Sequence, residues 1–283
     1  MIDSFRSRGD AILLVDGGDF FHRDLERGLA QSKAVWHEFA RAEYDAITLG
    51  KREFMAFDLV EELSAAEPLP IVCTNVEQLI DGQWVPVGAK YIMTTVAGVR
   101  VAVLSMISDI QLSPSVIAQL DDEVRLLKPL DEVKRWARYV RAEEGAELVV
   151  LLAMVDHKAM EQYATLLDGI DVMVGGYATR QQIAPELVGD VILNRVGSRG
   201  QRMASTQVII SPQGEIVDFG GSNVTLGPSF PEHEEVLADV KAAMDEAARL
   251  RRERREAIRE QATARRERLR QTESSPSETP QPE

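Results

Sequence analysis

The stretch from Tyr44 to Phe54 reads YDAITLGKREF and joins a short apolar run to a glycine and a charged cluster. An apolar run that ends in this way is typical of a buried strand followed by a loop. The same pattern, an apolar run followed by glycine and a polar residue, occurs in LLVDGGDFF (13–21) and in GIDVMVGGYAT (169–179). In an α/β protein, the loops at the carboxyl ends of the strands build the functional site. The three segments therefore predict an α/β fold with candidate site residues after three strands.

Helical patterns and further apolar runs lie on both sides of this stretch. Their β-α-β-α order, with wholly apolar strands, predicts sheets that are covered by helices. The region after Gly176 is richer in strands. The pattern predicts helices over 23–43, 53–66, 131–144 and 158–167. It predicts strands over 11–16, 45–49, 71–74, 147–152, 171–174, 191–196, 203–211 and 215–219. It also predicts a hairpin over 90–105 with its turn at Ala97-Gly98, a turn over 212–214 and a loop over 220–231.

The C-terminal part of the chain has a different composition. Acidic residues after Pro231 begin a long helical pattern, which we expect to run over 232–270. Its second half, 251–270, holds nine Arg against four Glu, a local charge of +5. The last residues, 271–283, are rich in Ser, Pro and Glu, and we expect them to be disordered. We therefore divide the chain into a domain over 1–231, a charged helix and a tail.

Composition excludes several classes of protein. The 283 residues carry a formal net charge of -14, which argues against general nucleic-acid binding. The apolar runs are too short for a transmembrane segment. The polar N-terminus shows no leader, so we expect a cytoplasmic protein, or an exported, periplasmic one if the true start lies upstream. The single cysteine, Cys73, excludes an intrachain disulfide, and its apolar surroundings predict a buried, inert thiol.

Seven segments in order resemble the metallophosphoesterase domain of the 5′-nucleotidase family, in the calcineurin-like phosphoesterase superfamily. The resemblance covers roughly residues 2–235 and implies a four-layer α/β/β/α sandwich with two metal ions at the strand ends. It also implies that the first strand of the family, with its Asp-x-His, is missing from this chain. Besides the three quoted above, the segments are PIVCTNVE (70–77), GVRVAVLSMIS (98–108), LVVLLAMVDH (148–157) and VILNRVGSRGQRMASTQVIISPQGEIV (191–217).

The resemblance also implies which residues stand at the family's metal-ligand positions. Asp19 matches the bridging carboxylate of a Gly-Asp motif. Lys51 and Arg52 stand where the family has the Asn ligand and the His of a Gly-Asn-His-Glu motif, and Met154 stands at a lone His position. The remaining lost ligands are the two histidines of a Gly-His-x-His motif, replaced by Tyr177 and Thr179.

These departures predict that no binuclear metal centre forms. One carboxylate cannot hold two divalent ions against their hydration, and two cationic side chains nearby repel a third cation. We therefore expect no cofactor. An alternative is a single divalent ion, Mn, Zn or Mg, on Asp19 and substitute ligands. The candidate substitutes beside the old site are Asp16, His22, Glu53, Asp156 and His157.

Three hypotheses for function follow. The first is a degenerate phosphoesterase domain that acts as a binding or scaffold module, in which Lys51, Arg52 and the backbone at Gly18 and Gly176 bind a phosphate-containing small molecule. The second is a divergent, metal-dependent phosphoesterase that hydrolyses a nucleotide or another phosphomonoester. The third is an adaptor that binds a protein partner, or a second copy of itself, through the helix 232–270.

Overall fold

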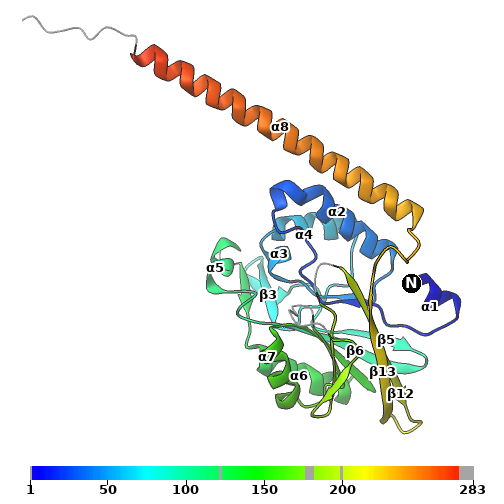
Figure 1. The fold of residues 1–283 in the computed structure, drawn as a ribbon. Coiled ribbons are helices and arrows are strands. Elements are labelled where there is room, and N and C mark those ends of the chain that lie inside the picture. The colour runs from blue at the N-terminus through cyan, green and yellow to red at the C-terminus, as the bar shows by residue number, and fades with distance from the viewer. Residues whose placement is uncertain (1, 121–122, 176–181, 198–199, 274–283) are drawn as a thin grey trace, which may run out of the picture.

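A six-stranded sheet forms the centre of the computed structural model, which describes residues 2–120, 123–175, 182–197 and 200–273 (Figure 1). The strand order is β10-β11-β9-β8-β6-β5, and the four inner strands run parallel. The carboxyl ends of these four strands therefore meet at one edge of the sheet. The strands are β5 (Ile92–Val96), β6 (Val99–Ile107), β8 (Leu148–Met154), β9 (Val172–Gly175), β10 (Glu186–Val188) and β11 (Val191–Arg195).

Two helices cover one face of this sheet. They are α6 (Pro129–Ala142) and α7 (His157–Leu166). Helix α6 begins with Pro129, has acidic residues in its first turn and buries Val133, Ala137 and Val140 on one stripe. These side chains and those of α7 form a continuous core with β6, β8 and β9.

A short strand pair and a long hairpin cover the opposite face. The parallel pair β1 (Val15–Asp16) and β2 (Ala46–Ile47) lies there with the hairpin of β12 (Arg202–Ile210) and β13 (Ile216–Thr225). Val15, Ala46 and Val208 share a second core with the large sheet. Each of these strands is therefore held by side chains on the sheet behind it.

A third core lies beyond the β1 and β2 pair. The helices α2 (Leu25–Arg41), α3 (Lys51–Phe54) and α4 (Phe57–Ala66) contribute Trp36, Phe54 and Leu59, which pack with Ile107 and Met154 at the ends of β6 and β8. A three-stranded sheet lies beside this core, in the order β4-β3-β7. The remaining elements are α1 (Ile2–Ser7), β3 (Val76–Ile80), β4 (Gln83–Pro86), α5 (Pro114–Ile117), a 3-10 turn (Ala118–Leu120) and β7 (Val124–Leu126).

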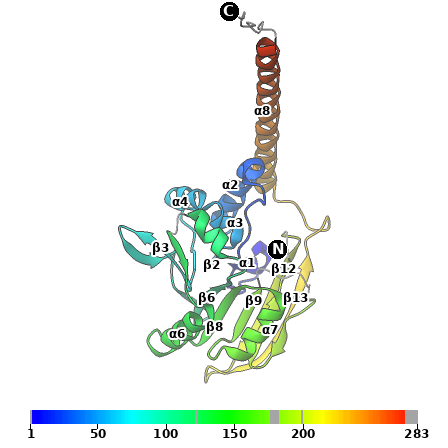
Figure 2. The ribbon, with the colours of Figure 1, turned by 90° about the vertical axis from the view of Figure 1, so that its left-hand side faces the viewer.

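The long helix α8 (Glu234–Glu273) packs on α2 through its first part only. Ala247 is 1% exposed, and Arg41 on α2 forms ion pairs with Asp239 and Glu235. The C-terminal part of α8 extends away from the domain as a single rod, as Figures 1 and 2 show, and residues 251–265 are all exposed. No described helix is long and apolar enough to cross a membrane.

Most predicted elements are present, and the differences have physical reasons. The predicted helix 53–66 is two helices, because the chain leaves helical geometry at Ala56. The predicted strands over 11–16 and 71–74 shrink to β1 and two isolated bridges. The loop predicted over 220–231 was wrong in its first half, since β13 continues to Thr225 by pairing with Arg202 and its neighbours. The hairpin of β3 and β4 was not predicted.

Candidate functional site

The loops after β1 and β2 approach each other closely. Gly18 has a φ of 85°, and a Cβ built on it would lie 2.8 Å from the Thr48 carbonyl oxygen. Asp19 also has a positive φ, of 64°, which aspartate tolerates better than most residues. A Cβ on Gly50 would lie 2.7 Å from the Asp19 nitrogen. The glycines at Gly18 and Gly50 therefore allow contact between the two loops that larger residues would block.

The Glu53 carboxylate binds these two loops together. Its side chain is fully buried, and it accepts hydrogen bonds from the backbone N–H groups of Asp19 (2.9 Å), Phe21 (2.7 Å) and Gly50 (2.8 Å). Burial raises the pKa of Glu53 to about 7, and the three N–H donors oppose that rise. Glu53, a candidate substitute ligand, thus has both oxygens engaged by the backbone.

Arg52 lies directly on Asp19. The guanidinium Nε is 3.3 Å from the Asp19 carboxylate, whose other oxygen accepts a hydrogen bond from the Arg52 backbone N–H at 3.1 Å. The same guanidinium donates to the carbonyl oxygens of Asp19 and Phe21. The Asp19 side chain is only 15% exposed, so the cation is its principal electrostatic partner.

The other candidate anion-binding groups are less well placed. The Gly18 N–H is already used, because it donates to the Asp16 carboxylate at 2.8 Å. Lys51 is exposed at the start of α3, and no ion pair to it occurs among the described residues. Gly176, Tyr177 and Thr179 lie outside the described residues. The described part of the predicted pocket therefore offers one unpaired cation, Lys51.

Met154 is a core residue rather than part of an open site. It is 0% exposed and packs with Phe21, Leu49 and Phe54. The packing joins the end of β8 to the loops after β1 and β2. The position of the family's lone His is thus filled by apolar packing.

The end of β11 carries a buried arginine that the sequence did not single out as a site. Arg195 has a side chain that is 3% exposed and pairs with Glu161 (2.8 Å) and Glu186 (2.6 Å). Its backbone N–H donates to Gln182 at 2.7 Å. His157 lies beside the same group, since its Nδ1 is 3.8 Å from Glu161 and makes no hydrogen bond within the described residues. These contacts tie α7 to β10 and β11.

The remaining candidate ligands have local partners. Asp156 caps α7 by accepting from the N–H groups of Lys158 and Ala159. His22 is exposed, and its Nδ1 lies 2.7 Å from the Asp24 carbonyl oxygen and 3.0 Å from the Asp24 nitrogen. Asp16 is half-buried, and partial removal of its carboxyl from water raises its pKa to about 6, against the opposing Gly18 N–H. Asp156 and His22 therefore serve local structure.

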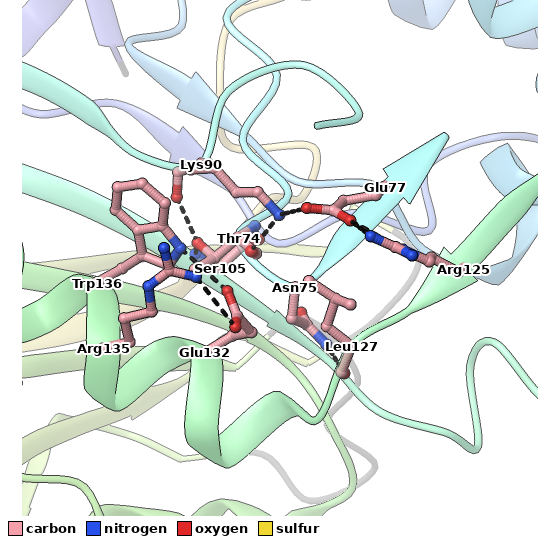
Figure 3. Close-up of polar contacts among 10 residues, drawn as sticks. All are labelled: Thr74, Asn75, Glu77, Lys90, Ser105, Arg125, Leu127, Glu132, Arg135 and Trp136. Atoms are coloured by element: carbon pink, nitrogen blue, oxygen red, sulfur yellow. Dashed lines mark hydrogen bonds and ion pairs between the residues drawn. The ribbon is translucent and has the colours of Figure 1, made fainter. Parts of the chain in front are cut away.

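A polar network at the β6 end was missed by the sequence reasoning. Thr74 exchanges hydrogen bonds with Ser105 (Figure 3). The side-chain amide of Asn75 bonds to both backbone groups of Ile107. Lys90 joins the network through the Thr74 carbonyl oxygen and pairs with Glu77 at 3.0 Å. The only signal in the sequence is the polar pair Thr74-Asn75 after an apolar run.

Figure 3 shows where this network ends on β7 and on the chain after it. Glu77 forms a second ion pair, with Arg125 on β7, and the Asn75 amide also donates to the Leu127 carbonyl oxygen. A separate contact lies on α6, where the Trp136 indole donates to Glu132. Every polar group described here has a protein partner, so the network positions the strand end rather than presenting a ligand site.

The residues present do not fit a binuclear metal centre. A divalent pair needs several carboxylate or imidazole ligands converging on it. Asp19 faces a guanidinium, Glu53 is engaged by three backbone donors and Met154 is in the core. Within the described ranges, no group of three or more His, Cys, Asp or Glu is arranged to hold a metal ion.

No protein-family model matches the chain. It is 23% identical, in an alignment 284 positions long, to the trifunctional nucleotide phosphoesterase YfkN of Bacillus subtilis, covering 87% of this chain and 19% of that protein. The crystal structure of calcineurin-like YfkN has a TM-score of 0.70 at 16% identity, covering 88% of each chain.

Two Thermus thermophilus structures are similar in fold. The 5′-nucleotidase precursor has a TM-score of 0.74 at 19% identity, over 87% of this chain and 52% of that one. The sulfate thiohydrolase SoxB also has a TM-score of 0.74, at 20% identity, over 86% of this chain and 44% of its own. The chain therefore spans about half the length of these structures and a fifth of the curated YfkN protein. Its fold is that of a calcineurin-like metallophosphoesterase domain related to 5′-nucleotidases, at the level of distant homology.

Proposed function

We propose that this distant relative of the calcineurin-like metallophosphoesterases is a binding or scaffold module without a binuclear metal centre, built as a four-layer α/β/β/α sandwich. The observation that carries the proposal is the Arg52 guanidinium on the Asp19 carboxylate, at 3.3 Å. A guanidinium supplies the positive charge that a metal ion would otherwise place beside this carboxylate. A divalent ion binding there would have to displace it.

The packing at Met154 supports the same proposal. A metal-binding imidazole needs an open approach to the ion, whereas Met154 is fully buried among Phe21, Leu49 and Phe54. The side chain now stabilises the junction between β8 and the two loops. The position that holds a lone His in the family the sequence resembles would thus serve the core.

A phosphate-containing small molecule is the ligand class that we propose for this module. Lys51 is exposed at the loop after β2, and its ammonium has no ion pair in the described structure. The Arg52 side chain is 41% exposed, so part of this cation is open to solvent beside Asp19. Two adjacent cations at a strand end favour an anion.

Metal analysis and an activity assay test the proposal together. The protein is purified with Mn²⁺, Zn²⁺ or Mg²⁺, its metal content is measured by mass spectrometry, and hydrolysis of a generic phosphomonoester is followed. We expect metal well below one ion per chain and hydrolysis no faster than in buffer. About two bound ions, with turnover that Asp19→Asn abolishes, would overturn the proposal.

A matched variant controls for nonspecific effects of removing a carboxylate. Asp81, like Asp19, has a positive φ, but it lies in the exposed turn between β3 and β4. Asp81→Asn should change neither metal content nor turnover. One ion per chain, lost in Asp19→Asn and kept in Asp81→Asn, would favour the divergent mononuclear phosphoesterase instead.

A further inference from the structure

Among the described residues, the outer part of α8 packs on no element of the domain. Every residue from Arg251 to Arg265 is exposed, and Figures 1 and 2 show this segment standing clear of the other elements. Fifteen residues of helix extend roughly 22 Å at 1.5 Å a residue. Isolated helices of this length are marginal in water, so a surface that stabilises one face favours the helical state.

Charge is segregated around this segment, which we call the outer α8 segment (251–265). At about 100° a residue, its six arginines fall within an arc of about 160°, whereas its three glutamates fall within about 60° on the opposite side. Arg255 and Arg259 form no ion pair with the described residues, and Glu253 pairs back toward the domain with Arg249. The arginines are Arg251, Arg252, Arg254, Arg255, Arg259 and Arg265, and the glutamates are Glu253, Glu256 and Glu260.

An apolar line runs through the middle of the basic arc. Ile258 is 56% exposed and has Ala262 one turn further on. Toward the domain, Met244 (56% exposed) and Val240 (40% exposed) continue the same line at helical spacing. Ala247, which packs on the domain, lies at one edge of this line, while Val240, Met244 and Ile258 stay exposed. The apolar line is therefore accessible along the rod.

We propose that the outer α8 segment binds the surface of an anionic lipid bilayer. A helix with apolar residues in the middle of a basic face lies in the interface plane, with its apolar side chains between the headgroups and its cations at the phosphates. The domain, residues 1–231, carries a charge of -12, which such a surface repels. Because the outer α8 segment extends away from the domain, its basic face can contact the bilayer while the acidic domain stays at a distance from it.

The apolar line favours a bilayer over a nucleic acid. Phosphate contacts of a nucleic acid need only the arginines, and exposed Ile258 would stay in water in such a complex. At a bilayer the same side chain leaves water. Ile258 and the arginines therefore contribute together to lipid binding, whereas the arginines alone would serve a nucleic acid.

Vesicle flotation with the full chain tests this proposal. The probes are phosphatidylcholine vesicles, without and with phosphatidylglycerol, at low salt. We expect binding only to the anionic vesicles. The triple variant Arg252→Gln, Arg255→Gln, Arg259→Gln should weaken it about 100-fold, since one basic residue near such a surface contributes a factor of about five. Ile258→Gln keeps a good helix former and should weaken it several-fold.

A charge-matched control removes three cations elsewhere. Lys134→Gln, Arg135→Gln, Arg138→Gln changes the charge of α6 by the same amount, at one half-buried and two exposed positions, and should leave binding unchanged. Equal loss in this control, or no binding to anionic vesicles, would refute the proposal. Insensitivity to Ile258→Gln, with an oligonucleotide bound through the same arginines, would assign the segment to nucleic acid. Circular dichroism confirms that the variants stay helical. The metal and activity assays do not involve α8, so either proposal can fail alone.

Discussion

Replacing Glu53 by Gln should change how the stability of this protein depends on pH. The buried carboxyl has its pKa raised from 4.5 to about 7. A carboxyl whose pKa is raised on folding stabilises the folded state below its unfolded pKa, and this contribution is lost as pH rises through the folded pKa. Glutamine cannot titrate, so the variant lacks the dependence.

The magnitude follows from the shift. Above about pH 5.5 the unfolded Glu53 is already ionised, while the folded group remains protonated until about pH 7. The folded and unfolded states therefore differ in the protonation of Glu53 over about 1.5 pH units, and each unit changes the free energy of unfolding by 1.36 kcal/mol. The free energy of unfolding of the natural protein should therefore fall by about 2 kcal/mol, relative to Glu53→Gln, between about pH 5.5 and pH 8.5.

The variant also has a cost that does not depend on pH. The carboxylate accepts from Asp19 and Gly50 on one oxygen and from Phe21 on the other. Glutamine can keep two of these bonds, but its NH₂ group then faces a donor. A buried N–H without an acceptor costs about 1–3 kcal/mol. Glu53→Gln should therefore have the lower free energy of unfolding at low pH, and the difference between the two proteins should become smaller as pH rises.

Urea unfolding at several pH values measures both effects. The slope of free energy against urea should be the same in the two proteins, since the surface exposed on unfolding does not change. Glu61→Gln is the control, because Glu61 is an exposed carboxylate on α4. A difference that stays constant, or grows with pH, would refute the reasoning. It would mean that the three N–H donors outweigh burial and hold the folded carboxylate ionised.

Two further predictions concern the same loops and the core behind them. Gly18→Ala should lower the free energy of unfolding by about 2–4 kcal/mol in chemical denaturation, because its φ is positive and its new Cβ would press on the Thr48 carbonyl oxygen. Gly98→Ala is the control, since its φ of 84° is also positive but the space around it is open, and it should cost about 1 kcal/mol. Equal losses in the two variants would contradict the close approach of Gly18 to Thr48. Cys73 is buried, and this burial raises the pKa of its thiol to about 12. A thiol reagent should therefore modify Cys73 only as fast as the protein unfolds. Rapid modification of the folded protein in buffer would contradict the burial of Cys73.

The local pattern predicted much of the fold. Helices and parallel strands appeared close to their expected positions because long periodic runs, such as 148–154, determine burial on their own. The β3 and β4 hairpin escaped prediction because its side chains are only partly buried. Strand β13 extends beyond its expected end because its pairing with β12 offsets the low strand propensity of Gly220 and Gly221.

The sequence by itself determined which ligand types are missing, since Lys51, Arg52 and Met154 can be identified without coordinates. It could not say what those residues do instead. Only the tertiary structure placed Arg52 on Asp19, put Met154 in a core with Phe54 and engaged Glu53 with three backbone donors. The physical reason is that residue type sets the chemistry a position can offer. Partners distant in the chain decide whether a charge meets a counterion, a metal ion or water.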